Sequence, residues 1–85
     1  MLSMTESAGQ HLTNLLQNDP DQTVLRFVAA EQGLAIEKGQ VQLNDIKLQH
    51  GERTVLAMDA AINSALAEKT LDVQITEQGA QLTLG

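Results

Sequence analysis

The pattern that most restricts the fold of this chain is an alternation of aliphatic and polar residues on both sides of a glycine. Residues 71–75 and 82–84 both alternate in this way, and Gly79 lies between them. Successive side chains of a strand point to opposite faces, so each segment predicts a strand with one apolar face. Glu77-Gln78-Gly79 fits a three-residue hairpin loop with glycine at its left-handed position. We therefore expect an antiparallel hairpin whose core-facing residues are Leu71, Val73, Ile75, Leu82 and Leu84.

Two helices are predicted on either side of the middle of the chain. The first spans about Thr5 to Asn18, where Ala, Leu, Leu and Leu at 8, 12, 15 and 16 form one apolar stripe. Two starts are open, because Thr5 can cap the free amides and Ser3 with Glu6 can form a capping box. The second helix runs from an N-cap at Asp59 to about Glu68.

The segments between the helices are expected to be extended. Strands are predicted at 23–30, 34–43, 46–49 and 54–58, with a turn at Glu31-Gln32-Gly33. Val41 and Leu43 alternate with glutamines, which places them on a buried strand face. The order of helix, strands, short helix and hairpin predicts an α+β protein that is mainly β, and a length of 85 residues fits one domain over 1–85.

Composition argues against several classes of partner. Phe27 is the only aromatic residue, so no stacking platform for single-stranded nucleic acid is available. The formal net charge of −6 disfavours both phosphate backbones and anionic membrane surfaces. We expect no nucleic-acid partner, no membrane association and, without a signal-peptide pattern, a cytoplasmic location.

Several short segments, in the same order and spacing, resemble the A-type iron–sulfur carrier, or HesB-like, domain. They are Thr5-Glu6-Ser7-Ala8, Leu25-Arg26, Asp45-Ile46, the stretch Val55 to Asp59, Leu66 and Leu71-Asp72-Val73. The resemblance runs from about Ser3 to Leu84. It implies a pseudobarrel of two small sheets, mixed or antiparallel, with an N-terminal helix and a second short helix. It also implies a link to iron–sulfur cluster assembly and a tendency to self-associate.

The family holds its cluster with three cysteines, and this chain has none. Counting from Leu25-Arg26 without a gap puts Gly33 on the glycine of the family's first ligand loop and Leu34 on its first cysteine. The sequence reaches Gly85 without the family's Cys-Gly-Cys. Thiolates bond soft iron and balance its charge, whereas a leucine has no lone pair to donate. We therefore interpret Leu34, with Gly33, as a degenerate ligand position, and expect Leu34 to close the loop against the core.

The remaining polar residues do not form a recognisable site. His11 and His50 lack a second ligand at the usual spacing, and both are expected on the surface. Ser3, Ser7 and Ser64 lie in helix contexts without a nucleophile elbow. Among the acids, Asp59 is interpreted as a cap and Asp72 as an outward strand residue, which leaves Asp45 without a catalytic partner. We expect no catalytic residue, metal ligand or cofactor.

These observations favour a non-enzymatic accessory domain that binds a protein of unknown identity, within iron–sulfur assembly, and that forms a weak homodimer at high concentration. Two alternatives stay open. One is a true iron or iron–sulfur carrier with non-cysteine ligands, or with ligands beyond Gly85. The other is a small enzyme of unrecognised type.

Overall fold

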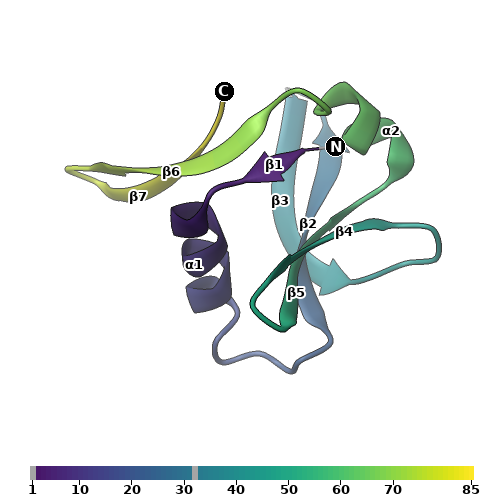
Figure 1. Ribbon diagram of the computed structural model, residues 1–85, viewed down its shortest axis with the longest axis horizontal. Coiled ribbons are helices and arrows are strands. Elements are labelled where there is room, and N and C mark those ends of the chain that lie inside the picture. The colour runs from purple at the N-terminus through teal and green to yellow at the C-terminus, as the bar shows by residue number, and fades with distance from the viewer. Residues whose placement is uncertain (1, 32) are drawn as a thin grey trace.

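A computed structural model describes residues 2–31 and 33–85 of the protein, as two sheets joined by a helix (Figure 1). The elements are β1 (Ser3–Met4), α1 (Glu6–Leu15), β2 (Thr23–Ala30), β3 (Gly33–Gln40), β4 (Ile46–His50), β5 (Arg53–Met58), α2 (Ala60–Ala65), β6 (Thr70–Thr76) and β7 (Gly79–Leu84). The predicted turn at Glu31-Gln32-Gly33 includes Gln32, which lies outside the described residues.

The larger sheet has four strands in the order β3-β2-β5-β4. Strand β2 pairs with β3 in an antiparallel hairpin and with β5 in parallel, and β4 and β5 are antiparallel. The smaller sheet has the order β1-β6-β7, with β1 parallel and β7 antiparallel to β6. Both sheets are mixed, and the mainly β fold with two helices confirms the predicted fold class.

Helix α1 lies between the two sheets and contacts β6 on one side and β4 and β5 on the other. Thr5 provides its N-cap, since the Thr5 hydroxyl accepts a hydrogen bond of 3.1 Å from the Ala8 amide. Ser3 lies in β1, so the alternative capping box does not form. The predicted apolar stripe is buried at Ala8, Leu12 and Leu16.

The core is aliphatic apart from Phe27, and strand β5 is its centre. Residues 55–58 of β5 are fully buried, because β2 and β4 cover the two edges of the strand and α1 covers one face. Other members of the core come from the N-terminal segment, α1, β2, α2 and β6: Leu2, Ala8, Leu12, Leu16, Leu25, Phe27, Leu66 and Leu71. Removing this apolar surface from water is the main stabilising contribution to the fold.

Helix α2 begins as predicted, with the Asp59 carboxylate accepting a hydrogen bond of 2.8 Å from the Ile62 amide. The predicted C-terminal hairpin is also confirmed, with Leu71 opposite Leu84 and Val73 opposite Leu82. Its loop is shorter than expected, since Gly79 already belongs to β7 and only Glu77 and Gln78 connect the strands. Gly79 has a φ of 110°, a conformation that glycine adopts at little cost.

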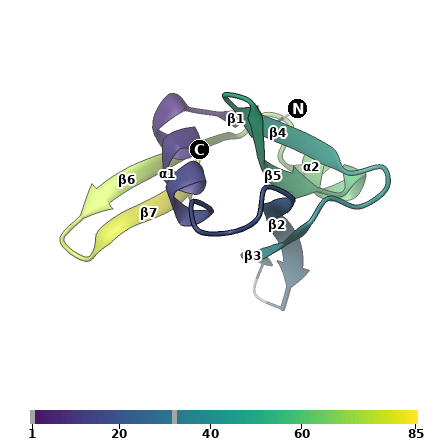
Figure 2. The same cartoon turned by 90° about the horizontal axis from the view of Figure 1, so that it is seen from below.

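The structure corrects three expectations about strands. The short strand β1 was not predicted, because two residues are too few to show a pattern. The predicted strand 34–43 ends at Gln40, so Val41 and Leu43 lie in a loop, where Leu43 is 92% exposed instead of buried. Ile75 does not face the core either. It is 76% exposed, because the β6–β7 hairpin extends beyond α1 (Figure 2). Leu84, also expected to face the core, is 39% exposed.

Candidate interaction surface

The position that the resemblance assigns to the first ligand lies at the tip of the β2–β3 hairpin. Gly33, with a φ of 129°, begins β3 and pairs with Ala30, and Leu34 pairs with Ala29. Leu34 is 41% exposed, so the expectation that it packs against the core is wrong. Figure 2 shows the reason: this hairpin projects away from α1 and from the smaller sheet. Leu34 is therefore a surface leucine.

No group of three or more histidine, cysteine, aspartate or glutamate side chains that could hold a metal is found among residues 2–31 and 33–85. His11 is half-buried on α1, and His50 belongs to β4. The three serines considered earlier lie in separate elements: Ser3 in β1, Ser7 in α1 and Ser64 in α2. Among the described residues, only Ser7 and His11 of these candidates come together, one turn apart on α1.

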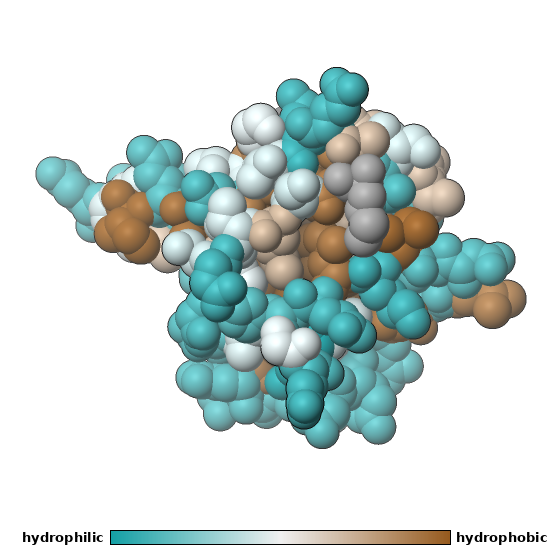
Figure 3. Space-filling view, in the orientation of Figure 1, coloured by the Kyte–Doolittle hydropathy of each residue, from teal (hydrophilic) through white to brown (hydrophobic). Residues whose placement is uncertain are grey.

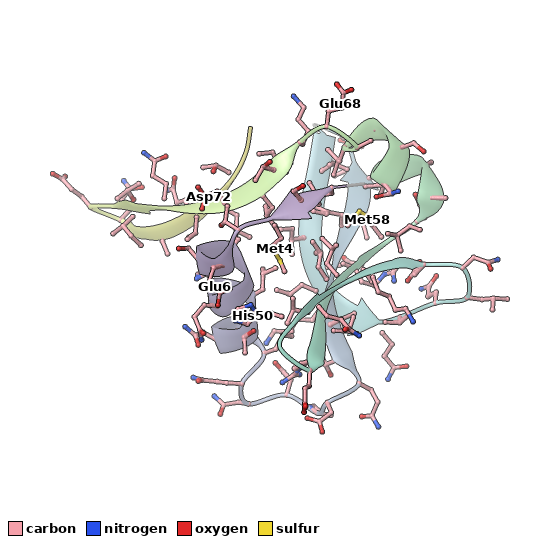
Figure 4. All side chains as sticks on the ribbon, in the orientation of Figure 1. Met4, Glu6, His50, Met58, Glu68 and Asp72 are labelled. Carbon is pink, nitrogen blue, oxygen red and sulfur yellow. The ribbon has the colours of Figure 1, made fainter. Side chains whose placement is uncertain are left out.

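His50 is not the surface residue expected from the sequence, because its side chain packs against α1 and is only 18% exposed. A Cβ added at Gly9 of α1 would lie nearest to Nδ1 of His50 and 2.9 Å from its Cγ. The Nε2 atom of His50 lies 3.7 Å from a carboxylate oxygen of Glu6 (Figure 4). Gly9 thus allows β4 to approach the helix, and His50 fills the space that a larger residue would need.

Arg26 and Asp45 form an ion pair on the four-stranded sheet, with side chains only 11% and 4% exposed. The Arg26 guanidinium also donates to the Gln40 carbonyl at 3.1 Å, and the Asp45 carboxylate accepts from the Gln42 amide at 2.8 Å. The hydrogen bond from Arg26 is the main cause that lowers the pKa of Asp45, and the same pair raises the pKa of Arg26. The pair fixes the loop after β3.

The other two acids named from the sequence also have structural partners. The exposed carboxylate of Asp72 accepts hydrogen bonds from the Thr5 hydroxyl at 2.7 Å and from the Val73 amide at 2.8 Å. These bonds, first that from Thr5, lower the pKa of Asp72. Asp59 caps α2. The three carboxylates therefore hold a loop, a strand junction and a helix start, instead of forming an acid–base pair.

A groove of about 460 Å³, with more apolar than polar surface, lies between α1 and the β6–β7 hairpin. The outer face of α1 forms one wall, with Glu6, Ser7, Gln10, His11 and Asn14. Val73, Ile75 and Ala80 form the other wall. Figure 3 shows hydrophobic surface at the outer part of this hairpin. The arrangement can accept an apolar side chain of another molecule. Ser7 and His11 lie one helical turn apart in its polar wall, but the hydrogen bonds of the described residues do not include one between these two side chains.

Two other hollows, whose surfaces are more polar than apolar, lie near the loop between α1 and β2. One is lined by Asp21, His50, Glu52, Arg53 and Thr54. The Arg53 guanidinium donates to the carbonyls of Pro20 and Thr23, at 3.0 and 3.2 Å, so it holds the loop in place.

The helices are short. The longer described helix, α1, has 10 residues, and no helix in the described part of the chain is long and apolar enough to cross a membrane.

Sequence reasoning missed the groove. The alternation of the C-terminal hairpin located its apolar face, but the place where α1 crosses the hairpin decides how much of that face is covered. The helix contacts β6 and runs across the hairpin instead of along it (Figure 1), so the outer part of the hairpin extends past the helix. The helix ends at Leu15, not at Asn18 as predicted. A local sequence pattern does not encode where a helix crosses a strand.

No family model matches the chain. Among curated proteins it is similar to the Fe/S biogenesis protein NfuA of Buchnera aphidicola subsp. Acyrthosiphon pisum (strain Tuc7), with 32% identity over 92 residues. That alignment covers 99% of this chain and 47% of the relative, so the chain spans about half the length of the curated proteins it matches. The same protein from strains 5A and APS matches equally.

Solved structures show the same fold. Escherichia coli SufA, described as involved in biosynthesis of iron–sulfur clusters, superposes with a TM-score of 0.82 at 14% identity, over 99% of this chain and 83% of that one. IscA with a [2Fe-2S] cluster gives a TM-score of 0.68 at 17% identity, over 100% of this chain and 84% of that one. The chain therefore has the HesB-like fold of these two proteins, and its sequence contains no cysteine.

Proposed function

We propose that this domain is a non-catalytic protein-interaction module linked to iron–sulfur cluster assembly. The observation that carries the proposal is Leu34, an exposed leucine at the position that the resemblance assigns to a cluster ligand. The carrier fold is kept over nearly the whole chain, whereas its thiolate chemistry is absent. A fold kept without its ligands supports a role in which the surface is used for recognition.

The polar residues support a role without catalysis. Asp45, Asp59 and Asp72 all bind groups of their own chain, as does Arg53. The groove beside α1 has one apolar wall, and its polar wall places Ser7 and His11 without a hydrogen bond that would activate the hydroxyl. The similarity to proteins named for iron–sulfur biogenesis supports the link to that process.

The first test asks whether the domain binds iron or an iron–sulfur cluster. The purified domain is incubated anaerobically with ferrous iron and sulfide, desalted, and measured by elemental analysis and visible absorption. We expect no stoichiometric iron and no cluster absorption, because no thiolate is available. Stoichiometric iron that survives desalting would instead support a carrier with non-cysteine ligands.

The second test concerns the partner. Proteins captured from lysate are identified by mass spectrometry, and each iron–sulfur assembly or recipient protein among them is then purified and titrated with the domain by calorimetry. We expect a direct complex, weakened roughly tenfold or more by Leu34→Asp if this side chain lies at the centre of the interface. Leu43→Asp is the matched control, because Leu43 is more exposed and lies in a different loop. Equal effects of the two variants would contradict the role of Leu34.

A further inference from the structure

The free edge of β7 is the starting point, because it is the outer strand of the three-stranded sheet. Thr70 and Gly85 exchange two backbone hydrogen bonds, of 2.9 and 3.1 Å, and therefore form a hydrogen-bonded pair of the β6–β7 ladder. Hydrogen-bonded and non-hydrogen-bonded pairs alternate along an antiparallel ladder. The register runs without a shift, so residues 80, 82 and 84 direct their backbone N–H and C=O groups away from β6.

The other strand edges of the two sheets carry features that hinder pairing with another chain, and β7 does not. Strand β3 has Lys38, β4 has Lys47 and a register shift after Leu48, and β1 has two residues only. Charges, bulges and short length are the usual protections of edge strands. Strand β7 has the sequence Gly-Ala-Gln-Leu-Thr-Leu, which has six residues, no charge and no proline.

The same three residues of β7 carry aliphatic side chains on one face. Ala80, Leu82 and Leu84 lie directly opposite Ile75, Val73 and Leu71 of β6. This face is buried at Leu71 and exposed at Ile75 and Ala80, where it forms the apolar wall of the groove beside α1. A strand added at β7 would therefore extend this apolar face with every second side chain.

The charges around the hairpin indicate which kind of partner strand fits beside β7. Residues 2–25 and 70–85 contain no lysine or arginine, whereas Glu6, Asp72 and Glu77 surround the hairpin. Figure 4 shows Glu6 and Asp72 close to the junction of α1 and β6. Asp72 lies on the polar face of the sheet, together with Gln81 and Thr83 of β7. Two copies of this chain, each with a formal net charge of −6, would repel one another, and a basic strand would not be repelled.

From these observations we infer that the β7 edge receives an extended segment of a partner protein in which apolar and basic residues alternate. Backbone hydrogen bonds to residues 80, 82 and 84 hold the added strand, and its apolar side chains continue the face that Leu82 and Leu84 form. Its basic side chains lie on the face of Asp72. The inference rests on the proposed role as an interaction module and names one recognition surface for it.

The test uses an octapeptide of alternating valine and lysine, added to the isotopically labelled chain and followed by NMR. We expect the amide signals of residues 80, 82 and 84 to shift and their hydrogen exchange to slow, while the edges at β3 and β4 stay unchanged. An octapeptide of alternating valine and glutamate should not bind. Raising the salt concentration should weaken the lysine peptide, because its charges are solvent-exposed.

Two variants separate the edge from the general surface. Ala80→Pro removes an outward N–H that β6 does not use, and should weaken peptide binding roughly tenfold through the lost hydrogen bond. Gln81→Lys keeps all backbone donors, adds a repelling charge to the edge and should weaken it as well. Gln49→Lys, the same substitution on the edge strand β4, is the control that should leave binding unchanged. Thermal melting confirms that each variant folds.

Several results would overturn the inference: equal binding of the acidic peptide, shifts at β3 or β4 instead of β7, unchanged binding by the folded Ala80→Pro and Gln81→Lys variants, or dimerisation of the chain through β7. Any of these would leave the proposed function intact if a purified partner still binds at Leu34. Conversely, if the lysine peptide binds but no purified iron–sulfur assembly or recipient protein does, only the proposed function is rejected.

Discussion

The two sheets differ in where they place their aliphatic residues and their cations. In the four-stranded sheet, β5 is buried along residues 55–58, and the strands carry four of the five lysine and arginine residues: Arg26, Lys38, Lys47 and Arg53. In the three-stranded sheet only Leu71 is buried, and no strand carries a cation. The larger sheet therefore supplies most of the core, whereas the smaller one presents an apolar face and a free edge to the surroundings.

The strongest way to break this comparison is to make the same truncation in both sheets. Leu56→Ala in β5 should destabilise the domain by about 2–5 kcal/mol, because Leu56 is fully buried and leaves a cavity. Leu82→Ala in β7 should lower the free energy of unfolding by less than about 2 kcal/mol, the low end of the range for buried leucines, since Leu82 is half-buried. Urea denaturation of both variants measures the difference. Equal losses would show that the smaller sheet belongs to the core as much as the larger one.

The ion pair of the larger sheet gives a second expected effect. Breaking a buried ion pair typically costs roughly 3–5 kcal/mol. Asp45→Asn should lower the free energy of unfolding by about 3 kcal/mol or less, because Arg26 keeps its hydrogen bond to the Gln40 carbonyl. The pKa of Asp45 is lower in the folded state, so its stabilising contribution is present above the ordinary aspartate pKa of 3.8 and is lost as the pH falls through the folded value.

The wild type should therefore lose stability more steeply than Asp45→Asn when the pH falls below about 4, the ordinary aspartate range. Urea titrations at a series of acidic pH values measure this slope. Glu52→Gln, which removes one exposed negative charge, controls for net charge. Parallel slopes in wild type and Asp45→Asn would show that the pair does not contribute to acid stability.

The contact between Gly9 of α1 and His50 of β4 sharpens the comparison, because the effect of one substitution on stability should reverse its sign. Gly9→Ala should destabilise by up to about 1–3 kcal/mol, because the new methyl group overlaps His50. In a His50→Ala background the same change should become neutral or stabilising by up to about 1 kcal/mol, the helix preference for alanine over glycine. A double-mutant cycle by thermal and urea unfolding measures this coupling. Additive effects would mean that His50 is not what excludes a side chain at position 9.

The smallest effects are expected at the two exposed tips. Leu34→Ala in β3 and Ile75→Ala in β6 should each change the free energy of unfolding by less than about 0.5 kcal/mol, as surface substitutions usually do. Calorimetric melting of both variants tests this. A loss of more than about 2 kcal/mol at Leu34, the range of buried leucines, would restore the packing role that the sequence first suggested.

Local patterns predicted most of the fold because short-range physics determines them. The caps at Thr5 and Asp59, the β6–β7 hairpin and the aliphatic core all follow from side-chain spacing and capping chemistry. The sequence could not show how far each element is covered. Ile75 alternates like a core residue, yet the strand period does not encode that the hairpin extends past α1 (Figure 2). Likewise, the approach of His50 to Gly9 joins residues far apart in the chain.

The candidate surface was predictable only in part. The resemblance located Leu34 and Gly33, and the absence of cysteine excluded thiolate ligation. Whether Leu34 is buried depends on the direction in which the β2–β3 hairpin projects, which is a property of the assembled sheet. The free edge of β7 depends on strand order, and β1 takes the opposite edge of β6 through a pairing that two residues could not reveal.

The parallel pairing of β1 with β6 has a consequence for how the domain is made. It joins Ser3 to Thr70 and Met4 to Leu71, and the Thr5–Asp72 bond closes a separation of 67 residues. Every strand of the larger sheet lies before residue 59, so that sheet emerges from the ribosome before β6 does. The start of the chain must wait for its partner strand, and contacts of such long range slow folding. Until then the unpaired β1 and the apolar side of α1 are the surfaces of the nascent domain that a chaperone would meet.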